Sequence, residues 1–141
     1  MVDPSLSVEF RCARCEAVTM RVVMTAADGP LGSERARPAG EAGVNPGVAG
    51  VRTEAGGLEL WTAVSEIAGG VEALRAAMLD GDADALLRLD REIVPFYCPQ
   101  CGLSYCEAHW VTWPIFDPEY PAWFEELRGR CPEGHERLIH D

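Results

Sequence analysis

The sequence predicts a small α+β domain that is held together by two structural zinc ions. All six cysteines and two of the three histidines fall into four pairs at the spacing of zinc ligands. The chain has 141 residues, of which 48% are hydrophobic, and this length suits one folded domain, residues 1–141. Strand-like alternation around the first pair and helical periodicity ahead of the second pair predict the mixture of strands and helices.

The four pairs supply eight ligands, which is the number that closes two tetrahedral sites. They are Cys12 with Cys15, Cys98 with Cys101, Cys106 with His109, and Cys131 with His135. Because cysteines stay reduced in the cytosol, where we expect the chain, the pairs indicate metal binding rather than disulfides. Neither Cys-x-x-Cys pair lies between a strand and a helix of a βαβ unit, which argues against a thioredoxin-like redox role.

Three segments lie between the N-terminus and the second ligand pair. Residues 6–25 alternate apolar and polar side chains on both sides of the first pair, which predicts a strand, a metal-binding turn and a second strand. Residues 26–57 are rich in glycine, proline, alanine and charge, and we expect a flexible loop there. Residues 58–95 are expected to form a mainly helical insertion that begins with a short strand.

The helical part of this insertion is expected to be a hairpin of two helices. Ser65 is a candidate N-cap of the first helix, and Gly81 is its stop signal. Asp82 or Asp84 is expected to cap the second helix, which Pro95 ends. After the third ligand pair, an aromatic-rich run is followed by residues 122–127, where we expect a helical turn.

The charge of the chain excludes some classes of partner. The formal net charge is −11, with 23 acidic residues against 12 basic ones, all of which are arginines. Such a chain repels phosphate backbones, so we expect no nucleic-acid partner. We find neither a secretory signal nor an apolar run long enough to cross a membrane, and expect a cytoplasmic protein without a membrane partner.

Spacing alone leaves three ways to distribute the pairs over two ions. In a cross-brace, the first pair joins the third and the second joins the fourth; in a ribbon, the first joins the second. In a local arrangement, the second joins the third. The ribbon gives one site with four cysteines and one with two cysteines and two histidines, whereas the other two give Cys₃His sites. All eight ligands are protein groups, so neither ion has an open position and both sites are expected to be structural.

Two stretches resemble a RING finger: Cys106-Glu-Ala-His109-Trp110-Val111-Thr112-Trp113 and Cys131-Pro132. In that family, a short helix starts at the third ligand pair, a tryptophan follows four residues after its second ligand, and the last pair begins Cys-Pro. The resemblance implies a RING-like, treble-clef cross-brace with a helical-hairpin insertion. The chain departs from the family in the long separation of the first two pairs, residues 16–97, and in a second pair spaced Cys-x-x-Cys.

The resemblance also implies a ubiquitin-ligase-type protein that recruits a conjugating enzyme and has no nucleophile of its own. The implied groove for that enzyme consists of Ala13, Arg14, Trp113 and Pro132, and Arg137 is the implied cation that contacts the ubiquitin-like modifier. The lysine-free composition indicates a GC-rich bacterial genome, so the implied pathway is a bacterial ubiquitin-like one. The alternative is a non-enzymatic zinc-binding scaffold for protein interactions.

Overall fold

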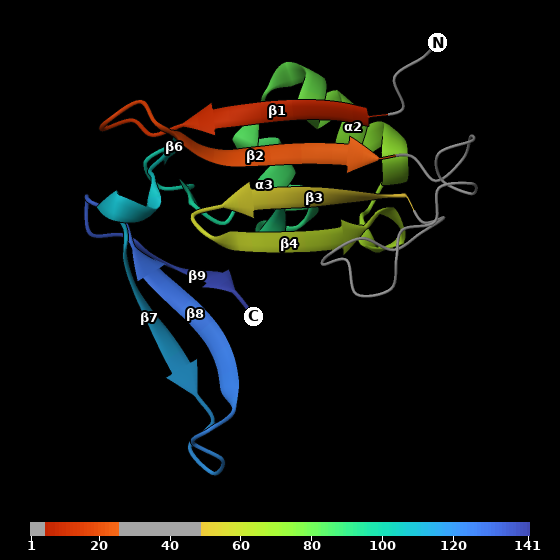
Figure 1. Cartoon of the computed structure of the whole chain (residues 1–141). Coiled ribbons are helices and arrows are strands. Elements are labelled where there is room, and N and C mark those ends of the chain that lie inside the picture. The colour runs from red at the N-terminus through yellow and green to blue at the C-terminus, as the bar shows by residue number, and fades with distance from the viewer. Residues whose placement is uncertain (1–4, 26–48) are drawn as a thin grey trace.

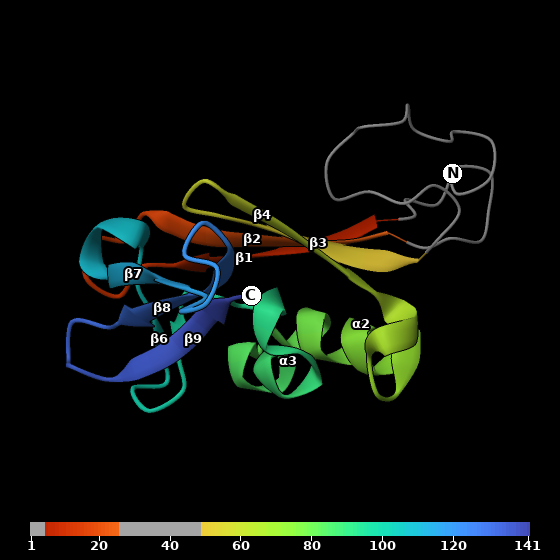
Figure 2. The same ribbon diagram turned by 90° about the horizontal axis from the view of Figure 1, so that it is seen from below.

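The computed structural model describes residues 5–25 and 49–141 of the chain. It is a small α+β domain with three antiparallel sheets and two α-helices in this described part. The largest sheet has four strands in the order β1-β2-β3-β4, and α2 and α3 lie against one of its faces (Figure 1, Figure 2). The strands are β1 (Ser5–Arg11), β2 (Val18–Thr25), β3 (Gly50–Ala55) and β4 (Leu58–Ala63).

The alternation of side chains explains which face of this sheet is covered. In β2, Met20, Val22 and Met24 are buried, while Arg21 between them is exposed. Side chains two residues apart share one face of a strand, so the three apolar residues point together toward the helices. The predicted strand, turn and strand over residues 6–25 are confirmed by the antiparallel pairing of β1 with β2.

The helical hairpin is also confirmed, although its first helix begins later than a cap at Ser65 predicts. The helices are α2 (Gly70–Asp80) and α3 (Ala83–Leu89). Ser65 does not cap α2, because it lies in the 3₁₀ turn η1 (Val64–Glu66) ahead of it. Gly81, in the left-handed conformation, ends α2, and the Asp82 carboxylate caps α3 by accepting from the N–H of Ala85 at 3.1 Å.

The C-terminal part contains the two smaller sheets and two 3₁₀ turns. Its elements are η2 (Arg91–Ile93), β5 (Tyr97–Cys98), β6 (Leu103–Ser104), η3 (Glu107–His109), β7 (Val111–Phe116), β8 (Phe124–Arg130) and β9 (Glu136–His140). β5 pairs with β6, and β7, β8 and β9 form a meander in which β8 is central. Figure 1 shows the β7–β8 hairpin extending away from the four-stranded sheet.

Two sequence predictions of secondary structure are wrong. The predicted loop 26–57 includes residues 50–55, which form β3 between β2 and β4; residues 26–48 lie outside the described part. Residues 124–127, expected in a helical turn, belong to β8 and pair with β7. Both strands are stabilised by pairing with neighbouring strands: β3 pairs with β2 and forms a hairpin with β4 across Gly56 and Gly57, and β8 pairs with β7 and β9. Strand preference depends strongly on such pairing, which the composition of one segment does not show.

None of the helices in the described residues is both long enough and apolar enough to cross a membrane.

Candidate metal centres

The structure brings all eight predicted ligands into two groups of four. The first centre contains Cys12, Cys15, Cys106 and His109, and the second contains Cys98, Cys101, Cys131 and His135. Within each group the ligand atoms all lie within 4.8 Å of one another. This interleaved grouping is the cross-brace among the three arrangements, so the ribbon and the local arrangement are wrong.

The first centre joins the turn between β1 and β2 to the turn η3. The Nδ1 atom of His109 lies 3.3 Å from the Sγ of Cys12 and 3.2 Å from the Sγ of Cys106. The Sγ atoms of Cys15 and Cys106 are 3.6 Å apart. Cys12 is buried and Cys15 is exposed, so this centre lies at the surface of the domain.

The second centre joins the β5–β6 turn to the turn between β8 and β9. The Nδ1 atom of His135 lies 3.5 Å from the Sγ of Cys98, 3.3 Å from that of Cys101 and 3.6 Å from that of Cys131. The Sγ atoms of Cys101 and Cys131 are 3.8 Å apart. Cys98 and Cys131 are both buried, which places this centre deeper than the first.

These separations fit a tetrahedral metal ion. With metal–sulfur bonds of about 2.3 Å and metal–nitrogen bonds of about 2.0–2.1 Å, a tetrahedron places two sulfurs about 3.8 Å apart and sulfur and nitrogen about 3.5 Å apart. The observed separations of 3.2 to 3.8 Å are close to both values. All six cysteines are free thiols, so the thiolate donors are available. Three thiolates and one imidazole suit zinc, and the donor set leaves no open coordination position.

Three of the ligand-bearing turns use a left-handed residue to fold back on themselves. Gly102 has φ +69° and donates its N–H to the carbonyl of Cys98 at 2.8 Å. Glu16 occupies the equivalent place after the first pair, with φ +65° and an N–H bond to the Cys12 carbonyl at 2.9 Å. Gly134, with φ +92°, closes the last turn. The first turn therefore adopts its shape without the glycine that favours it in the others.

The two centres differ in the electrostatics of their first cysteine. Burial opposes ionisation of Cys12, but main-chain hydrogen bonds from Cys106, Arg14 and Cys15 outweigh it and lower its pKa to about 6. Burial raises the pKa of Cys98 to about 11 despite the main-chain hydrogen bond from Cys101. A coordinated metal ion deprotonates a thiol, so an ion bound at the second centre has to overcome the cost of ionising buried Cys98.

Residues 102–105 connect the two centres, and contacts of Tyr105 hold this connection in place. Tyr105 is fully buried, and its carbonyl accepts from the Thr19 hydroxyl at 2.8 Å and from the Trp110 indole N–H at 2.9 Å. The N–H of Ala13 donates to the carbonyl of Ser104 at 2.8 Å. No sequence pattern indicates the roles of Thr19 and Tyr105, because both depend on contacts between distant segments.

Four of the predicted partner-binding residues gather around the last ligand-bearing turn. Arg14 forms an ion pair with Glu133, so the loop carrying exposed Ala13 lies beside the loop that begins with Pro132. Trp113 is half-buried in β7, and the guanidinium of Arg130, the residue before Cys131, lies 5.8 Å from its ring centroid. Glu133 was not among the residues that the sequence singled out.

Arg137 lies apart from this group and contacts the main chain. Its guanidinium donates to the carbonyl of Val94 at 2.8 Å, of Tyr97 at 2.7 Å and of Arg91 at 3.1 Å, and its Nε donates to that of Leu138 at 2.8 Å. Burial, with a smaller contribution from the nearby charge of Arg91, lowers its pKa to about 10. Its geometry is that of a clamp between β9 and the segment leading into β5.

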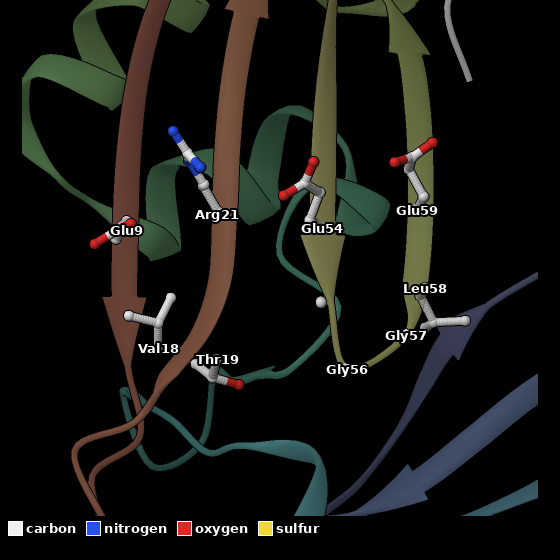
Figure 3. Close-up of a pocket in the computed structure, with 10 residues that line it drawn as sticks. Glu9, Val18, Thr19, Arg21, Glu54, Gly56, Gly57, Leu58 and Glu59 are labelled. Carbon is white, nitrogen blue, oxygen red and sulfur yellow. The ribbon is translucent and has the colours of Figure 1, made fainter. Parts of the chain in front are cut away.

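A shallow depression of about 510 Å³ lies on the open face of the four-stranded sheet (Figure 3). Strand register aligns Glu9, Arg21, Glu54 and Glu59 in one row across the four strands. Arg21 lies between Glu9 and Glu54, and cross-strand neighbours of opposite charge stabilise an exposed sheet face, whereas Glu54 and Glu59 are neighbours of like charge. Neither a cysteine nor a histidine lines this depression, and we assign it no chemistry.

Comparison with known proteins adds a family but no described relative. Neither a curated protein nor a solved structure matches the chain. One family does match, over residues 3–141 and thus over nearly the whole length, including all eight ligands. The chain belongs to this family, which is described as Domain of unknown function (DUF8328).

Proposed function

We propose that both centres bind zinc and that the protein is a non-catalytic, zinc-stabilised domain for binding other proteins. The observation that carries this proposal is the pair of Cys₃His groups, each built from two segments far apart in the chain. Zinc in such a site contributes free energy of folding directly, because its ligands are brought together only in the folded state.

The closed donor sets argue against metal-centred catalysis. A catalytic zinc site keeps three protein ligands and leaves a fourth position for water or substrate. Both centres here supply four protein ligands, so a bound ion would have no free position. The role left to the ions is to hold the ligand-bearing loops in one arrangement.

The surface that the ions organise is formed by two of these loops. The ion pair between Arg14 and Glu133 joins the first turn to the last, although the two residues are 119 positions apart in sequence. Exposed Ala13 and half-buried Pro132 lie next to these two residues in the chain. Two loops that the ions already hold side by side can bind a partner without a large entropy cost, because they need not become ordered on binding.

A RING-like ligase is the second candidate function, favoured by the interleaved grouping of the ligands. In this candidate, the surface of Ala13, Arg14, Trp113 and Pro132 recruits a conjugating enzyme charged with a ubiquitin-like modifier. Arg137 is left out of this surface, because its guanidinium is engaged by main-chain carbonyls.

Metal analysis of the purified protein tests the shared part of both candidates. We expect two zinc ions per chain, and one ion in each of the variants Cys15→Ser and Cys98→Ser, which remove one ligand from different centres. One ion or none in the unaltered protein would overturn the zinc proposal.

A discharge assay separates the two candidates. The protein is added to a conjugating enzyme of the same organism that carries its modifier as a thioester. A ligase accelerates discharge, and both Arg14→Ala and Trp113→Ala reduce that acceleration. The matched control Leu79→Ala, at an exposed position of α2, does not reduce it. No acceleration by the unaltered protein excludes the ligase and leaves the binding domain.

A further inference from the structure

The tip of the β7–β8 hairpin carries an unusual concentration of exposed aromatic side chains. We call it the aromatic tip and define it as Phe116, Tyr120, Trp123 and Phe124, which are 48%, 55%, 65% and 45% exposed. They are half of the eight large hydrophobic residues with high exposure in the described part of the chain. Exposed apolar side chains are ordinary when scattered, but a contiguous group on one projection marks an interaction site.

The aromatic tip is ordered before any partner binds. Tyr120 and Trp123 are the first and last residues of a turn with Pro121 at its second position, closed by the Trp123 N–H on the Tyr120 carbonyl at 2.8 Å. Their rings stack with centroids 5.0 Å apart, and the rings of Phe116 and Phe124 meet edge to face at 6.4 Å. A second main-chain bond, from the Asp117 N–H to the Trp123 carbonyl at 2.9 Å, closes the loop.

The charge of the hairpin indicates what kind of partner fits. Residues 111–127, which include the aromatic tip, contain four carboxylates and no basic residue, whereas the two arginines of the hairpin, Arg128 and Arg130, lie toward its base. The carboxylates are those of Asp117, Glu119, Glu125 and Glu126. Glu119 and Glu125 are exposed, whereas Glu126 pairs with Arg128. Aromatic faces attract arginine and lysine side chains through their quadrupole, and carboxylates attract them by charge, so both features of the hairpin favour cations.

We propose that the aromatic tip docks a basic segment of a partner protein, in which arginine or lysine side chains alternate with apolar ones. The inference rests on the proposed function as a protein-binding domain and adds a second surface, distinct from the one around Arg14. A nucleic acid is repelled by the carboxylates and by the net charge of −11. A second copy of this chain would bring the same carboxylates together.

Selection from a random peptide library tests the proposal without assuming a partner. The zinc-loaded full chain is the target, and the double variant Tyr120→Ala/Trp123→Ala is used for counter-selection. We expect the enriched peptides to contain at least two arginines or lysines next to an apolar residue. Enriched peptides without basic residues, or a failure to enrich any peptide, would overturn the proposal.

Binding measurements then assign the contacts. Using the strongest selected peptide with a fluorescent label, we expect Trp123→Ala to weaken binding about tenfold or more, as for a central aromatic contact. We expect Glu119→Gln/Glu125→Gln to weaken binding about threefold or more and to reduce its salt dependence. Leu79→Ala is the matched control, since Leu79 is equally exposed at 67% on α2 and its loss should leave affinity unchanged. Equal affinity of Trp123→Ala and the unaltered protein contradicts the proposal.

The outcomes separate this inference from the proposed function. Peptides that bind equally to the double variant but lose affinity with Arg14→Ala support a protein-binding domain and reject the aromatic tip as the docking surface. Tight binding of a single-stranded RNA or DNA oligonucleotide that Trp123→Ala removes overturns the choice of partner. Concentration-dependent dimerisation that the same variant removes shows that a second copy occupies the tip.

Discussion

Removal of the metal ions should unfold one part of the chain and leave another part folded. The perturbation is treatment of the zinc-loaded protein with a strong chelator at neutral pH. We expect residues 97–141 to lose their structure, together with the turn that carries Cys12 and Cys15, because these segments supply all eight ligands. The four-stranded sheet and its two helices should remain folded.

The magnitudes decide this outcome. A structural zinc ion contributes about 10–16 kcal/mol of apparent binding free energy in small zinc-dependent folds at pH 7. Folded domains retain about 0.05–0.15 kcal/mol of net stability per residue, which is about 2–7 kcal/mol for residues 97–141. The contribution of either ion therefore exceeds the stability that this part could have without it.

The buried core is one continuous cluster that also includes Cys12, Cys98 and Cys131, but seven of its side chains come from β2, β3, the helices and η2 and are not metal ligands. These seven side chains lie between the four-stranded sheet and the helices, and each is almost completely shielded from solvent. They are Met20, Val22, Met24, Val51, Leu74, Leu86 and Ile93. Full burial of each such side chain is worth about 1.5–3 kcal/mol, so several of them can sustain the sheet and helices after the ions leave.

Hydrogen exchange with peptide-level resolution measures the difference. On chelation, amides of β7, β8 and β9 should exchange at the rate of an unfolded chain, while those of β2, β3 and α2 stay protected. Restoring zinc is the control and should restore protection in the C-terminal strands. Unchanged protection of β7 to β9 after both ions are removed, or equal loss of protection throughout, would refute the reasoning.

Three further predictions concern single residues. Glu16 and Gly102 both have positive φ, which glycine adopts at lower cost than other residues. Glu16→Gly should therefore raise the free energy of unfolding by about 0.5–1 kcal/mol, and Gly102→Ala should lower it by about 1–2 kcal/mol. Thermal melts in which either change has the opposite sign would contradict this. Trp110→Phe should lower the free energy of unfolding by only about 1–2 kcal/mol in denaturant titration. The reason is that the carbonyls of Phe96 and Tyr105, which accept the indole N–H, each have a second donor. A loss of about 4 kcal/mol would contradict this explanation. Arg137→Met should lower the free energy of unfolding by about 3 kcal/mol or more, because methionine leaves main-chain carbonyls near β5 without their charged donor. Arg137→Lys should lower it less, because lysine still supplies a charged donor. Equal stability of the two variants would argue against the clamp.

The ligands could be identified from the sequence because ligand spacing is a local property. Two side chains that point at one ion from one tight turn must lie two or three residues apart, as Cys12 and Cys15 do. How the pairs combine is not local. It depends on the path of residues 16–97, and spacing therefore left three arrangements open, of which only the resemblance to a RING finger favoured the observed one.

The features that the sequence analysis missed depend on how separate segments pair and pack in the folded chain. β3 is assigned by its pairing with β2 and β4, and its sequence of Gly50-Val-Arg-Thr-Glu-Ala55 has only weak strand character. The sequence predicted a helical turn in the region of the aromatic tip, and the exposure of these side chains depends on the projection of the β7–β8 hairpin. The clamp formed by Arg137 could not be anticipated either, since its acceptors are main-chain carbonyls from residues 91–97 and from its neighbour Leu138.

The positions of the ligands relative to the β7–β8 hairpin connect the metal centres to the aromatic tip. β7 begins two residues after His109, a ligand of the first centre, and β8 ends directly before Cys131, a ligand of the second. The two ions would thus hold the two strands of the hairpin at its base, one each. Together with the pairing of β8 with β9, this anchoring at the base would set where the aromatic tip points. Zinc binding and protein binding are then coupled, and a chelator that frees the base of the hairpin should also abolish docking at its tip.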